Sequence, residues 1–207
     1  MKKSILSVMM AVVVMTASFA QEKRYGVERA ILKKNTVIAA MGITQQTISS
    51  VQYIDDYGLK ESAETFMSMQ GQMFTIFTMM KDGYMFSANI AAKQGTKVNL
   101  AAMDDYKSVN YLNLSNEVKE KYQIAEKGSE LFLGKNCQKY ELSVAAQGQT
   151  VQATVWVWQG LPLKSSVNVA GNTIVEEATE IEEGAVIAKE KFELPEEVFF
   201  MEVKPQM

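Results

Sequence analysis

The sequence predicts a mainly β fold: a single, strongly curved antiparallel sheet of about ten strands with one or two short helices. Runs with period-2 alternation recur along most of the chain, turn residues separate them at regular spacing, and one window alone has helical periodicity. Several runs are apolar on both faces. A sheet that curls can bury one such face on helices or around a cavity, which favours a fold able to hold a ligand.

The most regular pattern lies in residues 150–181. In its first run, Val and Ala occupy the odd positions 151–157, while Gln, Thr and the two tryptophans occupy the even positions. Gly and Pro at 160–162 end this run, and a Gly-Asn pair at 171–172 turns the chain again. We therefore expect three antiparallel strands in this stretch.

The N-terminal half of the chain predicts further strands of the same kind. We expect them at residues 25–34, 43–54, 59–69 and 73–81. The last of these is apolar on both faces. Asp82-Gly83 follows it directly and is the strongest short-range hairpin signal in the sequence.

The middle of the chain predicts short strands at 97–102 and 107–112, followed by a change of period. Apolar residues then recur at helical spacing in a Lys/Glu-rich window, behind Ser115 or Asn113 as a possible N-cap. We expect one short helix near residues 116–124.

The rest of the chain predicts a hairpin and a closing segment. Residues 129–133 and 136–145 form the hairpin around a Gly-Lys turn, with Tyr140 and Leu142 pointing inward. The Phe-Glu-Leu-Pro sequence at 192–195 is expected to dock its Phe and Leu on the sheet.

The first twenty residues have the pattern of a secretory signal peptide: two lysines, a short apolar run, and small residues before Gln21. The apolar run is shorter than the roughly 20 residues of a membrane-spanning helix. No later run approaches that length, and no Cys follows it as a site of lipid attachment. We expect a signal peptide at 1–20 and a single β domain at 21–207. After cleavage this domain would be periplasmic or secreted, without a transmembrane segment, and not a lipoprotein.

Composition excludes several classes of function. Without residues 1–20 the chain has 19 basic and 24 acidic residues, so it lacks the basic surface that nucleic-acid binding requires. It contains no His, which excludes Ser-His-Asp triads, Cys-His pairs and His-based metal sites. Cys137 is the single Cys, so no intrachain disulfide forms, and a buried position in a strand is expected for it.

Paired carboxylates are the remaining catalytic candidates. The chain has several sequential pairs, such as Asp55/Asp56 and Glu176/Glu177. Neighbours in a strand point to opposite faces, and in turns they are solvated, whereas a glycosidase needs two carboxyls across a cleft. We expect no enzyme, no cofactor and no metal.

Methionine and aromatic residues form the candidate ligand-binding surface. Thioethers ligate Cu(I), but Met also fills core gaps or lines adaptable apolar grooves. The tryptophan pair suits core packing, sugar stacking or the rim of an acyl pocket. The residues assigned to the binding surface are Met67, Met69, Phe74, Phe77, Met79, Met85, Trp156 and Trp158.

Six motifs follow one another along the chain. They are YIDDYG at 53–58, KDGYMFS at 81–87, LGKNCQKYEL at 133–142, VWVWQGLPLK at 155–164, EEATEI at 176–181 and FELP at 192–195. With the signal peptide, this order resembles a family of secreted Gram-negative envelope domains of unknown function that is similar to the lipoprotein-carrier (LolA/LolB-like) superfamily. The resemblance implies an unclosed half-barrel covered by short helices, with an apolar concavity that accepts acyl chains in the carriers. The carriers rely on a barrel arginine, which maps onto neither Arg24 nor Arg29.

Two functions remain open from the sequence. The first is a non-enzymatic extracytoplasmic protein whose concave sheet face binds an apolar ligand, such as a lipid, an acyl chain or a lipidated peptide. The alternative is an envelope interaction or scaffold module whose concavity is filled by its own side chains and holds no small-molecule ligand.

Overall fold

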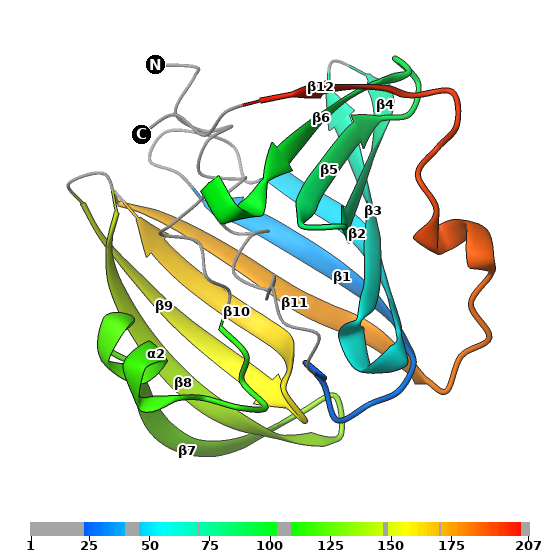
Figure 1. Cartoon of the computed structure of the whole chain (residues 1–207). Helices are drawn as coiled ribbons and strands as arrows, with labels where there is room; N and C mark the ends of the chain where they lie inside the picture. Colours follow the sequence, from blue (N-terminus) through cyan, green and yellow to red (C-terminus); the bar gives the residue numbers. More distant parts are fainter. Residues whose placement is uncertain are drawn as a thin grey trace.

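Twelve strands form one open sheet in the computed structural model (Figure 1). The structure describes residues 23–39, 46–69, 71–102, 109–146, 149–169 and 171–203; the predicted signal peptide at 1–20 lies outside them. The strands are β1 (Ala30–Ala39), β2 (Gln46–Asp55), β3 (Lys60–Met69), β4 (Gln72–Lys81), β5 (Tyr84–Asn89), β6 (Gln94–Asn99), β7 (Ala125–Phe132), β8 (Lys135–Ala146), β9 (Gln149–Trp158), β10 (Leu161–Val169), β11 (Asn172–Glu183) and β12 (Phe199–Glu202).

The sheet consists of two antiparallel meanders joined through the first strand. Strands β1 to β6 follow one another in space, as do β7 to β11, and β1 pairs with β11 to connect the two halves. β12 returns to the far edge and pairs in parallel with β6. The sheet therefore stays unclosed, with β12 at one edge and β7 at the other.

The predicted fold class is confirmed, with twelve strands in place of about ten. β12 was missed because four residues are too few to show an alternating pattern. The first strand runs over residues 30–39 rather than 25–34. The strand predicted at 107–112 is wrong where the structure describes it, because residues 109–112 lie outside any strand.

The helical elements are short. α2 (Asn116–Lys121) begins at Ser115, whose Oγ accepts a hydrogen bond from the Val118 N–H at 3.2 Å. This confirms the predicted helix and one of its two candidate caps. The other helical elements are single 3₁₀ turns: η1 (Asp56–Gly58), η2 (Leu100–Ala102) and η3 (Lys189–Phe192).

Different segments cover the two faces of the curved sheet. On the concave face, α2 and its flanking residues cover β8 to β10, where Tyr111 and Tyr122 pack with Tyr140 and Leu142 (Figure 1). On the convex face, the C-terminal segment crosses β3 to β6. Leu194 packs there against buried Phe77, as expected for the closing segment.

A glycine allows the last strand to dock. Phe200 of β12 packs edge-on against Phe86, with the ring centroids 5.2 Å apart. Gly95 lies beneath the same ring, and a Cβ at this position would lie 2.6 Å from Phe200 Cε1. Any larger residue at 95 would therefore push the Phe200 ring off the convex face.

Gly95→Ala is expected to destabilise the protein by about 1–3 kcal/mol, because the added methyl overpacks the contact with Phe200. Urea denaturation of Gly95→Ala, Phe200→Ala and the double variant measures this as a double-mutant cycle. The part of this cost that the ring causes should disappear once the ring is removed, whereas the 2.8 Å approach of the added Cβ to the backbone oxygen of Ser87 remains. Additive costs would show that the Gly95 contact is not what positions β12.

Candidate functional site

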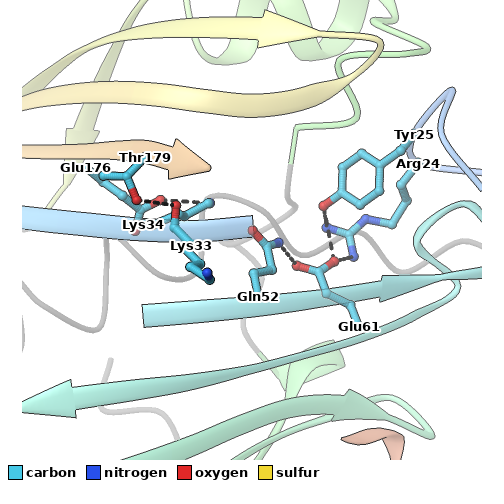
Figure 2. Close-up of polar contacts among 8 residues, drawn as sticks. All are labelled: Arg24, Tyr25, Lys33, Lys34, Gln52, Glu61, Glu176 and Thr179. Carbon is cyan, nitrogen blue, oxygen red and sulfur yellow. Dashed lines mark hydrogen bonds and ion pairs between the residues drawn. The ribbon is translucent and has the colours of Figure 1, made fainter. Parts of the chain in front are cut away.

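A buried polar cluster lies at one end of the concave face (Figure 2). Arg24 Nη1 contacts Glu61 Oε2 at 2.6 Å, and the Tyr25 hydroxyl donates to the same oxygen at 3.1 Å. Gln52 Nε2 donates to the other carboxylate oxygen at 2.5 Å. All four side chains are at least nine-tenths buried. The Glu61 carboxylate is thus held by three donors from two separate parts of the chain, the Arg24-Tyr25 segment and β2.

The segment that carries Arg24 is anchored at both halves of the sheet. The Arg24 N–H donates to Tyr57 O in the β2–β3 turn at 2.9 Å, and the Gly26 N–H donates to Gln159 O in the β9–β10 turn at 2.8 Å. Gly160, at φ 79°, makes room for this segment, because a Cβ there would lie 2.7 Å from Arg24 O. The turns on both sides thus fix where the guanidinium points.

The electrostatics of the cluster keep Arg24 charged and Tyr25 neutral. Burial disfavours the charged guanidinium, but the adjacent Glu61 carboxylate outweighs this effect, and the pKa of Arg24 is raised. Burial, together with the same carboxylate, raises the pKa of the Tyr25 phenol. Tyr25 therefore remains a hydrogen-bond donor throughout the physiological pH range.

Gln52 leaves one polar atom without a partner. Its amide nitrogen is committed to Glu61, because a carboxylate only accepts hydrogen bonds. Gln52 Oε1 is buried and has no hydrogen-bond partner within the part of the chain that the structure describes. In Figure 2 this oxygen points away from Glu61, along the face that also carries Lys34. An unpaired buried acceptor of this kind is costly and suited to receive a donor.

A second buried ion pair extends the cluster across the sheet. Lys34 is 6% exposed, and its Nζ contacts Glu176 Oε1 of β11 at 3.0 Å. Lys34 and Gln52 lie on the same face of neighbouring strands, since Lys34 pairs with Ser50 in the β1–β2 register. We call the residues that cross the concave face here the polar band: Lys34, Gln52, Glu61 and Glu176.

Apolar rows lie on either side of the polar band. Towards the Arg24 end, Leu32, Ile54 and Leu163 belong to a fully buried core. At the opposite end of the same strands, an apolar row crosses six strands. It consists of Val167, Ile174, Ile38, Ile48, Met67 and Phe74.

The exposure of this apolar row varies along its length. Val167, Ile174 and Ile48 are buried, whereas Ile38, Met67 and Phe74 are only partly buried. The concave face thus changes from apolar to polar to apolar along β1, β2 and β11.

An open groove of about 780 Å³ lies at the Arg24 end of β3 and β4. Arg24, Glu61 and Met80 form part of its wall, and Ile187 and Phe192 from the C-terminal segment line it as well. Its rim carries charges of both signs, including Lys60, Lys189, Asp55 and Glu193. The groove gives solvent a route to the ion pair at the edge of the polar band.

The eight predicted binding residues are spread over both faces of the sheet. Met67 and Phe74 are cross-strand partners on the concave face. Met85 is buried there beside Leu100. Phe77 and Met79 are buried beneath the C-terminal segment on the convex face. Met79 also lines the open groove.

The side chain of Met69 lies outside the described residues.

Trp156 and Trp158 lie on the face of β9 opposite to the buried valines. Trp156 Nε1 donates to Glu130 Oε2 at 2.8 Å, and Lys139 Nζ lies 4.9 Å from its ring centroid. Lys135 Nζ lies 4.4 Å from the Trp158 ring centroid. Only Met67 and Phe74 of the eight therefore meet in the apolar row.

The polar band was missed from the sequence, although part of its signal was present. Lys34 and Gln52 occupy the same phase of their strands as Leu32 and Ile54, so each is a polar residue at an inward position. Nothing in the sequence indicated that Arg24, 37 residues from Glu61, would meet it.

Other reactive groups are few. No three Asp, Glu, His or Cys side chains gather as a metal-binding group within the described ranges. Cys137 is fully buried, and burial raises the pKa of its thiol, which disfavours the reactive thiolate.

No protein-family profile and no curated protein sequence matches this chain. Among solved structures, an uncharacterized conserved protein from Thermus thermophilus matches with a TM-score of 0.51 and 8% identity, over 95% of this chain and 99% of that one. This likeness establishes a shared fold alone.

Lipoprotein LppX from Mycobacterium tuberculosis matches with a TM-score of 0.45 and 11% identity, over 78% of this chain and 90% of that one. A LolA superfamily protein from Nitrosomonas europaea matches with a TM-score of 0.40 and 9% identity, over 89% of this chain and 97% of that one. LolA-superfamily proteins are thus among the solved structures similar to this chain, as its sequence led us to expect. None of the helices in the described ranges has the length and apolar character to cross a bilayer.

Arg24→Met is expected to destabilise the protein by about 3–5 kcal/mol, because it leaves the Glu61 carboxylate buried and without its counter-charge. Arg29→Met is the matched control. Arg29 is half exposed in its 2.8 Å pair with Asp55, so its loss should cost much less than the loss of Arg24. Urea denaturation of both variants gives the comparison. Equal losses would mean that the buried pair has no special role.

Proposed function

We propose that this protein is a non-enzymatic, exported binding protein that holds the apolar part of a lipid, acyl chain or lipidated peptide on the concave face of its sheet. The observation that carries the proposal is the apolar row beyond the polar band. Ile38, Met67 and Phe74 remain partly exposed there, on a face otherwise occupied by packed side chains. Apolar surface of this kind, rimmed by polar groups, is typical of ligand-binding grooves.

The polar band supports an amphiphilic ligand in particular. An acyl chain held over the apolar row and turned along β1 and β2 would bring its polar end past Thr36 and Ser50 towards Lys34 and Gln52. Gln52 Oε1 is an acceptor without a partner among the described residues, so a hydroxyl or amide on the ligand would satisfy it. Ligand sites commonly combine an apolar lining with a few polar groups that fix orientation.

Met67→Glu is expected to abolish saturable binding of a fluorescent fatty-acid probe, because it places a charge within the apolar row. Met73→Glu is the matched control: it makes the same substitution on the next strand, where the side chain is 69% exposed on the opposite face. Probe titration, with far-UV circular dichroism to verify folding, measures both variants. Loss of the fold in Met67→Glu, or equal loss of binding in both, would contradict the proposal.

Native mass spectrometry of the protein purified from a Gram-negative periplasm tests the ligand directly. A stoichiometric acyl species that is released on denaturation would identify the ligand class. A bare mass, under conditions in which a known lipid carrier retains its lipid, would instead favour the interaction or scaffold module. Cleavage before Gln21 in the same sample is the expected sign of export.

A further inference from the structure

The two edges of the open sheet differ in how they are protected against pairing. β7 is polar and exposed, and a bulge between Glu126 and Ser129 with Gly128 at φ 83° interrupts it. Charges and bulges of this kind are what proteins use to keep an edge strand from pairing with another chain. β12 has one charged side chain, Glu202, but no bulge interrupts its pairing with β6, and its other exposed side chains are apolar. Phe199 is 71%, Met201 54% and Val203 43% exposed.

β12 is also held rigidly. Phe200 packs on the convex face with Phe77 and Phe86, above Gly95. Residues on either side of Phe200 point to the opposite face, because side chains alternate along a strand. Phe199, Met201 and Val203 therefore form one apolar row along the edge, which we call the edge row.

The hydrogen-bond pattern of β12 determines which backbone groups are available to a partner. The N–H groups of Phe199 and Val203 donate to Lys93 O and Lys97 O, at 3.1 and 2.9 Å, on the β6 side. Backbone groups of alternate residues point to opposite sides of a strand. The N–H and C=O groups of Phe200 and Glu202 therefore point to the outer edge of the sheet.

We propose that this edge pairs with β12 of a second copy of this chain, antiparallel and symmetric about Met201. In this register Phe200 and Glu202 of one protomer exchange backbone hydrogen bonds with Glu202 and Phe200 of the other. Met201 lies opposite the same residue of its mate, in a non-hydrogen-bonded pair. Phe199 lies opposite Val203 on the same face. The two sheets become one continuous sheet.

Self-pairing in this register lets the outward backbone groups of Phe200 and Glu202 hydrogen-bond and places the edge row of each copy against the edge row of the other. Glu202 does not face its own mate, which avoids the destabilising contact of like charges, and it contacts Lys97 of its own chain at 3.2 Å. An arbitrary peptide would satisfy the backbone groups but not the side chains.

Disulfide trapping tests the register. With Met201→Cys, the two Cα atoms would lie about 4.5 Å apart, within the roughly 4.4–6.8 Å that a disulfide spans. Mild oxidation should therefore give a covalent dimer on a non-reducing gel. Phe199→Cys is the matched control, because its two copies lie four residues apart along the strands, roughly 13 Å. The native Cys137 is fully buried and should not contribute. Absence of the Met201→Cys dimer, or equal trapping in both variants, would overturn the proposal.

Sedimentation of unmodified protein tests the pairing itself. The wild type should show a concentration-dependent monomer–dimer equilibrium. Glu202→Pro removes the outward N–H of residue 202, and an edge strand tolerates proline at a position whose N–H faces solvent. This variant should weaken dimerisation by about tenfold or more. Glu202→Ala, which loses the contact with Lys97 but keeps the N–H, should dimerise as the wild type does. A wild type that stays monomeric at every concentration, or a Glu202→Pro variant that dimerises equally well, would overturn the proposal.

Discussion

The buried ion pair between Arg24 and Glu61 is the interaction on which the arrangement of the sheet depends. The short segment that carries Arg24 hydrogen-bonds to the β2–β3 turn on one side and to the β9–β10 turn on the other. These turns belong to different meanders, so the segment ties the two halves together at one end. The ion pair fixes the segment, because a buried charge that loses its partner costs far more than an exposed one. The β1–β11 pairing joins the halves along the middle of the sheet.

The polar band gives the concave face an amphiphilic character that a uniform core would not have. Lys34, Gln52, Glu61 and Glu176 are buried or partly buried between apolar rows. Lys34 pairs with Glu176 within the band, and Glu61 pairs with Arg24 at its edge. Paired charges and one unsatisfied amide oxygen are less favourable to stability than well-packed apolar side chains of similar volume. Their position beside partly exposed apolar residues suits recognition of a molecule with both characters. The open groove at Arg24 gives one solvent route to the band.

An unclosed sheet has two edges, and the chain treats them differently. β7 is protected by its bulge and its charges, whereas β12 shows mostly apolar side chains and is anchored by Phe200. The proposed ligand-binding face and the β12 edge lie on parts of the sheet that do not share residues. Assembly through β12 therefore leaves the apolar row around Met67 and Phe74 unobstructed by the pairing residues.

The sequence by itself determined the local structure. Period-2 alternation, the Asp82-Gly83 turn and the Ser115 cap are local signals, and they specified the β class, most strands and the helix, because near neighbours decide these features. The eight candidate residues were chosen by residue type, which carries no information about face; Met67 and Phe77 therefore ended on opposite sides of the sheet. Only the tertiary structure decided that Arg24 meets Glu61, that a polar band crosses four neighbouring strands beside an apolar row, and that four residues near the C-terminus form an edge. These are contacts between segments far apart in the chain, and their partners are set by register and curvature, which no short window of sequence contains.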